Sequence, residues 1–468
     1  MSATDLCFLP AKSLARLLRT RKLSRAEVMR AFIAQIERVN PKVNAIVTFL
    51  PELALKKAKL LDQKRDQSLP LAGLPIAYKD LIPTKNVRTT FGSPIFEQHV
   101  PTRDHLVVER LSAAGAILLG KTNTPEFGAG SQTFNKVFGA TRNPYDVSKT
   151  CGGSSGGAAV AVACGMLPFA DGSDLAASLR NPGSFCNVVG LRPTPGRVPN
   201  WPADDAWASL GVLGPIARTA EDAAFLLSAM AGPDPLAPIS LGEPGKIFSK
   251  SLVRTFTKTR IAWSRTLGGL PVEPRVTAVL EQQKRVFRDL GCRVEEAEPD
   301  LSGADEAFHT LRALQFAQRY GELYRTRRAL LKETIVWNIE QGLALDAARI
   351  ARALGLRSQL YHRMREFLRR YDFLLAPVSQ VAPFPVEQEY PAEISGVKME
   401  NYIDWMKSCY RVTVTAHPAV SVPAGFTPDG LPVGLQIIGR YRDDFGVLQL
   451  AHAFESATGA WKRRPPIL

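Results

Sequence analysis

The stretch CGGSSGGAAVAVACG at 151–165 places two serines among four glycines, directly ahead of a run of small apolar residues. Three roles are open to such a segment. It can cradle a phosphate with backbone N–H groups, make a sharp structural turn into a helix, or expose a serine as a nucleophile. Each role requires different partner residues elsewhere in the chain.

The phosphate and nucleophile roles both lack a required partner near this stretch. A phosphate loop of the form GxxxxGK[ST] needs a lysine after its glycines, and none follows here; GxGxxG is absent as well. The elbow pattern GxSxG is matched by GGSSG and GSSGG, but an elbow follows a hydrophobic strand, and the preceding NPYDVSKT is polar. None of the six histidines lies in a catalytic motif: His99, His105, His309, His362, His417 and His452. By default the stretch is therefore a glycine-rich turn.

Two further segments carry residue types that suit acyl chemistry. Ser178 follows Ser154 by 24 residues, within ADGSDLAASLRNPG, after four residues whose backbone N–H groups are available as donors. Upstream, Lys79 ends the apolar run of GLPIAYKD. Burial disfavours the charged form of a lysine, so a lysine leaving a buried strand is a candidate for a lowered pKa. A neutral lysine can serve as a general base where no histidine is available.

These segments, in this order, resemble the amidase signature family, and the resemblance covers most of the chain. The lysine block is GLPIAYKDLI, and the central block is AAGAILLGKTNTPEFGAG followed by FGATRNPYDVSKTCGGSSGG. The nucleophile block is ADGSDLAASLRNPGSFCNVVGLRPTPGRVP, and the C-terminal block is HPAVSVPAGFTPDGLPVGLQIIGR. Several ordered motifs are far more specific than GxSxG alone.

The resemblance implies a Ser–cisSer–Lys catalytic group made of Ser178, Ser154 and Lys79. Ser178 is expected to attack an amide carbonyl and form an acyl-enzyme. Ser154, after a cis peptide bond with Gly153, is expected to relay the proton to Lys79, the general base. The implied activity is hydrolysis of a small amide to a carboxylic acid and ammonia or an amine, with no cofactor and no metal.

The resemblance also assigns supporting groups around the nucleophile. The oxyanion hole is expected from the backbone N–H groups of four consecutive residues, Leu175, Ala176, Ala177 and Ser178. Ser155, Asp174 and Arg180 match positions that hold the site together. Two features depart from the pattern: Ala176-Ala177 stand where the family has Gly-Gly, and Cys151 stands where proline is common. The two methyl groups restrict φ and narrow the pocket beside the hole, and Cys151 is expected to be a packing residue.

The substrate is the least constrained part of this interpretation. The pocket region contains Trp337, Tyr361, Tyr402 and Trp405, which would suit aryl or other apolar amides. An alternative is a glutaminase-type amidotransferase subunit, but residues 324–346 read YRTRRALLKETIVWNIEQGLALD and lack an EVKRRIMLG-like segment. A further alternative is a catalytically silent scaffold or binding homologue in which the two alanines close the oxyanion hole.

The charge and cysteine content limit the partners and the compartment. The net charge is +15, but lysine and arginine are dispersed and no nucleic-acid module is recognisable, so we expect no nucleic-acid partner. No apolar run is long enough to span a membrane. Six cysteines without CxxC spacing are typical of reduced thiols in a cytoplasmic protein. The expected partners are the amide substrate and water, with a homodimer left open.

The elements that must position these residues alternate between short apolar runs and helical patterns. Ser24 and Glu27 form a capping box ahead of apolar residues at helical spacing. Strands are expected at 45–49, 74–78, 116–120, 167–170, 259–263, 373–379, 420–426 and 430–439, and helices at 106–113, 158–164 and 219–231, with a mostly helical segment over 273–370. This alternation predicts an α/β fold.

The predicted architecture is a single large domain with a central mixed β-sheet covered by helices on both faces. The chain offers no long polar linker and no internal repeat. The resemblance assigns residues 1–468 to one amidase signature domain, with a core at about 60–240 and 370–460. A helical substrate-pocket region is expected at about 300–370.

Overall fold

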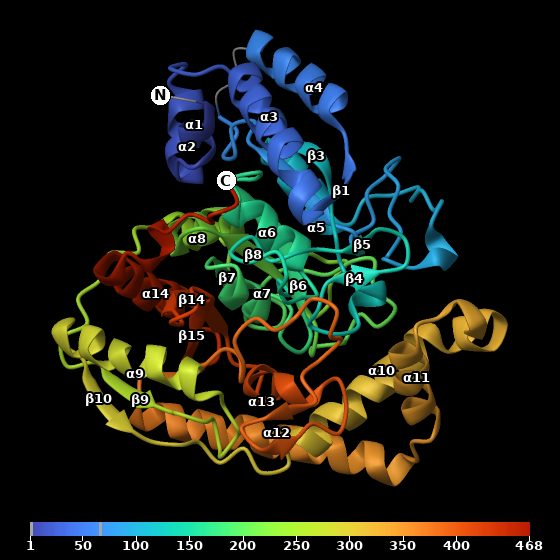
Figure 1. Ribbon diagram of the computed structural model, residues 1–468, viewed down its shortest axis with the longest axis vertical. Helices are drawn as coiled ribbons and strands as arrows, with labels where there is room; N and C mark the ends of the chain where they lie inside the picture. The colour runs from blue at the N-terminus through green and yellow to red at the C-terminus, as the bar shows by residue number, and fades with distance from the viewer. Residues whose placement is uncertain (1–2, 65–67) are drawn as a thin grey trace.

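The computed structural model describes residues 3–64 and 68–468 (Figure 1). Its helices are α1 Ala3–Cys7, α2 Ala11–Arg19, α3 Arg25–Val43, α4 Pro51–Gln63, α5 Leu106–Ala113, α6 Gly156–Ala163, α7 Arg180–Phe185, α8 Ala220–Met230, α9 Pro274–Asp289, α10 Ala304–Arg327, α11 Glu333–Leu343, α12 Ala347–Arg370, α13 Lys407–Val414 and α14 Asp444–Thr458. Its strands are β1 Ile46–Phe49, β2 Pro75–Lys79, β3 Ile117–Thr122, β4 Phe134–Asn135, β5 Gly139–Ala140, β6 Phe169–Asp174, β7 Val189–Arg192, β8 Val212–Ala217, β9 Arg260–Trp263, β10 Arg293–Glu296, β11 Phe373–Pro377, β12 Glu393–Ile394, β13 Val397–Lys398, β14 Ala419–Phe426 and β15 Pro432–Gly439.

Two sheets organise the described part of the chain. The larger has eight strands in the order β10-β9-β11-β15-β14-β7-β8-β6, and the smaller has three in the order β1-β3-β2. Both sheets are mixed. In the larger sheet, β9 pairs in parallel with β10 and β11, while β15 pairs antiparallel with β11 and β14. In the smaller sheet, β3 pairs antiparallel with β1 and in parallel with β2. β2 and β6 are therefore edge strands of different sheets, and both reach the residues identified in the sequence.

Helices cover both faces of the eight-stranded sheet. On β15, a Cβ at Gly434 would lie against Ser184 of α7, and one at Gly439 against Val447 of α14. These positions are an odd number of residues apart, so they face opposite sides of the sheet. α8 and α9 pack against α14, on the face of the sheet that α14 covers. The predicted α/β sheet covered on both faces is confirmed.

The helix α6 lies between the two sheets (Figure 1). It contacts β1, β2 and β3 of the smaller sheet and β6 and β8 of the larger one. Its sequence, GGAAVAVA, is buried throughout, because only small side chains let a helix approach strands on several sides. The start of α6 is thereby held where the edges of the two sheets meet.

Most predicted elements occur at the expected positions. The Ser24–Glu27 capping box is present at the start of α3, and α5 spans the predicted range. Three strands of the larger sheet were not predicted: β7, β8 and β10. β8 reads VLGPIA, in which the interior glycine and proline are typical of turns. The segment expected to be mostly helical contains β10 between α9 and α10.

The helices α10, α11 and α12 form the segment between the sheet strands β10 and β11. α10 and α11 pack against each other and extend away from the sheet at one end of the molecule (Figure 1). Within the described residues, no helix combines the length and apolarity needed to cross a membrane.

Candidate active site

The side chain of Lys79 is buried at the end of β2, among the hydroxyl groups of three serines. Its Nζ lies 2.7 Å from Oγ of Ser154, 2.9 Å from Oγ of Ser155 and 3.0 Å from Oγ of Ser173. Burial lowers the pKa of Lys79 to about 7, although the charges of Asp171 and Asp174 act to raise it. A substantial fraction of this amine is therefore neutral near neutral pH.

The serine contacts match the hydrogen-bonding capacity of a neutral amine. Such an amine has two N–H donors and one lone pair. The Ser155 hydroxyl donates to the carbonyl oxygen of Ser173 at 3.3 Å, so it accepts from Lys79. With the second N–H directed to Ser173 Oγ, the lone pair of Lys79 is free to accept the proton of Ser154, its nearest contact.

The backbone around Ser154 has an unusual path. The Gly153–Ser154 peptide bond is cis, as the resemblance implies, and Gly152 has φ +73. A Cβ at Gly157 would lie 2.4 Å from the backbone nitrogen of Asn123, so only glycine permits this close approach. The Ser131 hydroxyl donates to the carbonyl oxygen of Gly153 at 2.6 Å. The glycines therefore make the turn and the close packing that place Ser154 beside Lys79.

Ser178 follows β6 and is 7% exposed. Its carbonyl oxygen accepts the N–H of Ser155 at 3.2 Å, which joins the Ser178 segment to the Ser154–Ser155 segment. Within the described part of the chain, the N–H groups of 175–178 have no hydrogen-bond acceptor, whereas the N–H of Leu179 donates to Asp174. None of the residues in 175–178 has a positive φ, so the alanines at 176 and 177 sit in a conformation they adopt without strain. Unpaired backbone donors of this kind can bind an oxyanion.

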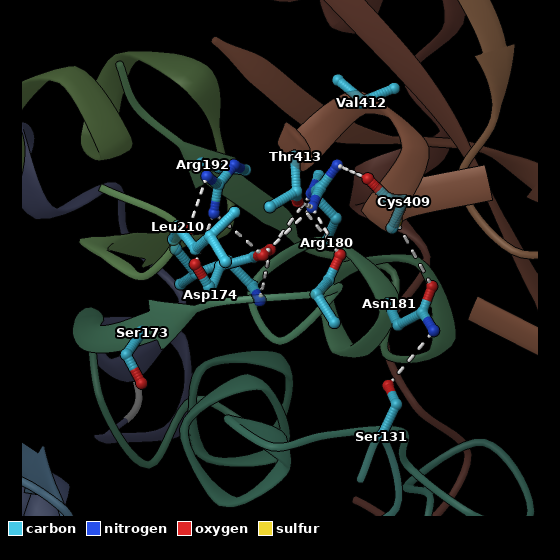
Figure 2. A network of polar contacts seen from close by, with 12 residues as sticks. Ser131, Ser173, Asp174, Arg180, Asn181, Arg192, Leu210, Cys409, Val412 and Thr413 are labelled. Atoms are coloured by element: carbon cyan, nitrogen blue, oxygen red, sulfur yellow. Dashed lines mark hydrogen bonds and ion pairs between the residues drawn. The ribbon is translucent and has the colours of Figure 1, made fainter. Parts of the chain in front are cut away.

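Arg180 and Asp174 form a buried network behind this segment (Figure 2). Arg180 donates to both carboxylate oxygens of Asp174 at 3.0 Å and to the carbonyl oxygen of Ala176 at 2.7 Å. It also reaches Gln436 and Thr413 at 2.8 Å. Burial acts to raise the pKa of Asp174, but the charges of Arg180 and Arg192 outweigh it and lower that pKa to about 2. The network holds the turn before Ser178 in one shape.

Several residues at the site were not singled out from the sequence. Ser173 and Asp171 lie on β6, and Asp171 Oδ1 accepts the backbone N–H of Lys79 at 3.1 Å. Asn181 donates to Ser131, as Figure 2 shows. These four residues lie within or beside the family-like blocks, but nothing in the sequence distinguishes them from their neighbours: Ser131, Asp171, Ser173 and Asn181. Their roles depend on which strands become neighbours in space.

Of the four aromatic residues assigned to the substrate region, two lie near a cavity. This cavity of about 70 Å³ is lined by His309, Thr310, Ala313, Trp337, Asn338, Gln341, Leu345, Arg349 and Ile403. Tyr402 packs edge-on against Trp337 and accepts a hydrogen bond from Arg312 at 2.6 Å. Trp405 is 1% exposed and packs between Phe185 and Phe384, and Tyr361 stacks on His417. Trp405 is thus a core residue.

All six cysteines fall within the described residues, and each is free and buried. Cys151, beside the glycine–serine turn, contacts the carbonyl oxygen of Thr141 at 3.4 Å. Burial raises the pKa of its thiol to about 12, so it is not a thiolate at neutral pH. Cys151 is a packing residue, as expected.

A buried lysine in hydrogen-bond contact with Ser154, in a segment that a backbone hydrogen bond joins to the Ser178 segment, is an arrangement that can support serine chemistry with an amine as base. The chain belongs to the amidase family, whose model, described as Amidase, matches residues 27–448. It is an amidase signature enzyme, an amidohydrolase.

Three relatives illustrate the breadth of this family. The Acylamidase of Rhodococcus erythropolis is 35% identical over 472 residues, covering 100% of this chain and 98% of the relative. A Glutamyl-tRNA(Gln) amidotransferase subunit of Geobacillus kaustophilus is 36% identical over 479 residues, covering 96% of this chain and 97% of the relative. The crystal structure of a bacterial aryl acylamidase of the amidase signature family superposes with a TM-score of 0.92 at 29% identity, covering 98% of each chain.

Proposed function

We propose that this amidase cleaves small amides through an acyl-enzyme on Ser178, with Ser154 as proton relay and Lys79 as general base. The observation that carries the proposal is the 2.7 Å contact between the buried Lys79 amine and Ser154. A neutral amine at this place supplies the base that no histidine supplies.

In the first half-reaction, Ser178 Oγ attacks the amide carbonyl carbon. Its proton passes to Ser154 Oγ as the proton of Ser154 passes to Lys79 Nζ. The carbonyl oxygen becomes an oxyanion, which the N–H groups of 175–178 stabilise, each donor contributing about 3 kcal/mol. The C–N bond then breaks, and Lys79 returns the proton through Ser154 to the leaving nitrogen. Ammonia or an amine departs.

In the second half-reaction, water attacks the ester carbonyl of the acyl-enzyme. The same relay takes the water proton to Lys79 and returns a proton to Ser178 Oγ as the C–O bond to the enzyme breaks. The carboxylic acid leaves and the free enzyme is restored. Each proton removed from a nucleophile is thus delivered to a leaving group, and neither half-reaction consumes a co-reactant other than water.

For the substrate we propose an aryl or other apolar amide. The similarity to proteins named Acylamidase and aryl acylamidase supports this class. We propose that Trp337, which lines the cavity, and Tyr402 beside it contact such a group; Lys79, Ser154 and Ser178 are not among the residues that line this cavity. We assign the wall of the substrate pocket to the helical region 300–370, within a single unit spanning 1–468. We place the enzyme in the cytoplasm, acting without nucleic acid and as a candidate homodimer.

A second candidate is a glutaminase-type amidotransferase subunit. The 36% identity to a protein named as a Glutamyl-tRNA(Gln) amidotransferase subunit favours it. Release of ammonia from free glutamine, but not from aryl amides, would support this candidate over the first. A protein that releases neither ammonia nor amine from any amide would fit the silent scaffold.

The test combines serine labelling with a substrate panel. A fluorophosphonate probe should label Ser178 in the full chain, Ser178→Ala should abolish labelling, and Lys79→Ala should slow it at least 100-fold, because a positioned base contributes about 10²–10⁴ in rate. Aliphatic, aryl, carbamoyl and peptide amides are then compared by ammonia or amine release. Unlabelled, folded wild-type protein would contradict the proposal.

A matched control distinguishes loss of chemistry from loss of fold. Ser13 lies on the N-terminal helix α2, distant in sequence from every residue in the proposed mechanism. Ser13→Ala should keep full labelling and turnover. If it lowers labelling as much as Lys79→Ala does, the probe reports general folding and not the relay.

A further inference from the structure

Asp171 connects the edge strands of the two sheets at the candidate active site. It lies on β6, the edge of the eight-stranded sheet, with a fully buried side chain. Its Oδ1 accepts the backbone N–H of Lys79, the last residue of β2 and of the smaller sheet's edge, at 3.1 Å. Lys79, the proposed base, is therefore tied to β6, the strand that leads to Ser178.

Side chains of β6 contact both the backbone N–H and the side-chain amine of Lys79. Asp171 and Ser173 are two residues apart on one strand, so their side chains lie on the same face. Asp171 accepts from the backbone of Lys79, and Ser173 Oγ lies 3.0 Å from its Nζ. The remaining carboxylate oxygen of Asp171, Oδ2, has no hydrogen-bond partner among the described residues. A buried carboxylate with a free oxygen acts on its surroundings mainly through its charge.

The charged and titratable groups around this carboxylate come from three strands and the loops beside them. Burial raises the pKa of Asp171 to about 6, while the Lys79 N–H bond and the charges of Lys121 and Lys79 act to lower it. The ionisable neighbours of this cluster are Tyr78 and Lys79 on β2, Lys121 on β3, Asp174 on β6, and Asp80 and Asp104 in the loops. α6, which packs against β2 and β6, has no titratable side chain.

The neighbours of Asp171 have other hydrogen-bond partners. Lys121 Nζ donates to the carbonyl oxygen of Ile82 and to Thr84, and Asp80 accepts from Thr90. Asp174 is paired with Arg180. Asp171 is thus the carboxylate that contacts Lys79 directly and has no cationic hydrogen-bond partner in the described structure.

We propose that Asp171 is a positioning residue that anchors the backbone at Lys79 and, through its charge, sets the pH at which Lys79 can accept the proton of Ser154. This inference rests on the proposed function and deepens it. A negative charge beside an amine favours the ammonium form. Without Asp171, Lys79 would lose its proton at lower pH and would be a weaker base.

The test is the pH dependence of the fluorophosphonate labelling rate of Ser178 in Asp171→Asn. Asparagine keeps an oxygen that can accept the Lys79 N–H, removes the charge, and replaces the second oxygen with an NH2 group. The acidic limb of the profile should shift to lower pH by about one unit. The maximal labelling rate, reached on the plateau at higher pH, should also be lower. If Asp171→Asn does not fold, Asp171→Ser is measured instead and should shift the limb in the same direction.

The matched control is Asp222→Asn. Asp222 on α8 is also fully buried and accepts two backbone N–H groups, those of Ala11 and Lys12. Its replacement should leave the acidic limb unchanged. A folded Asp171 variant whose limb coincides with that of wild type overturns the inference, whereas a wild-type protein that is never labelled overturns the proposed function.

Discussion

Lys79 differs from a typical protein lysine in what surrounds its amine. Three serine hydroxyls lie within 3.0 Å of Nζ, and within the described structure this amine forms no salt bridge with a carboxylate. A hydroxyl can either accept from an ammonium or donate to a neutral amine, whereas a carboxylate only accepts. The surroundings therefore tolerate both protonation states, as a residue that takes up and returns a proton requires.

The pH dependence of amide hydrolysis should follow the titration of Lys79. Its pKa is about 7, and the amine is a base only when deprotonated, that is, above this pKa. We expect kcat/KM to rise about tenfold per pH unit below pH 7 and to level off above about pH 8. Initial rates from pH 5 to 10 measure this, and a flat profile from pH 6 to 10 would exclude Lys79 as the base.

Sequence reasoning reached Lys79, Ser154, Ser155 and Ser178 because each lies in an ordered motif. It did not reach Asp171, which stands in the same quoted segment as Ser178. Asp171 acts on Lys79 across 92 residues of chain, and its neighbourhood exists only once β2 and β6 are edge to edge. Motif spacing carries no information on which sheet edges meet.

At the scale of elements, the short helix α5 has an unusual N-cap. Val107 N–H donates to Nδ1 of His105 at 3.1 Å, so Nδ1 carries no proton, and Nε2 lies 2.9 Å from Oδ1 of Asn200 and donates to it. Burial lowers the pKa of His105 to about 4. The cap functions in the neutral form of the ring, and protonation would remove the acceptor.

The stability of the protein should therefore fall in acid partly through His105. Its folded pKa of about 4 lies below its ordinary value, so its contribution is present above about pH 6.5 and is lost as the pH falls through 4. His105→Asn keeps a capping oxygen and cannot be protonated. Between pH 7 and pH 4, urea unfolding should show wild type losing about 3 kcal/mol relative to this variant. Parallel stability curves would contradict the expectation.

Elements with strong local signals were predictable, and those defined by their neighbours were not. The capping box of α3 and the apolar runs of β14 and β15 are visible in the sequence. β8 contains Gly214, where a Cβ would lie 2.2 Å from the carbonyl oxygen of Leu191. That glycine interrupts the strand pattern in the sequence because the adjacent backbone needs the space.

At the scale of the whole molecule, Arg180 joins segments that are far apart in sequence. It contacts Asp174, Cys409, Thr413 and Gln436, which belong to β6, α13 and β15. All of these side chains are buried. The turn before Ser178 is thereby tied to the C-terminal third of the chain. This connection depends on the folded arrangement and was not predictable beyond the supporting role assigned to Arg180.

Removing one partner of this buried pair should destabilise the fold globally. Within the described structure, Arg180→Met leaves Asp174 with Arg192 as its remaining charged partner, and breaking such a pair costs about 3–5 kcal/mol. Chemical denaturation measures this loss. The control is Arg325→Ala, which removes an exposed ion pair with Glu322 and should cost less than about 1 kcal/mol. Equal losses for the two variants would mean that the buried network is not a special source of stability.

Because the cysteines are buried, the reactivity of their thiols can be used to follow local motions of this protein. Cys7, Cys164, Cys292 and Cys409 lie in different regions of the chain, and all are shielded from solvent. A thiol-alkylating reagent can reach each one only when its region opens, so the modification rate at each position reports the frequency of that local opening. The modification rates of these four cysteines therefore report separately on local opening at α1, at the end of α6, ahead of β10 and at α13.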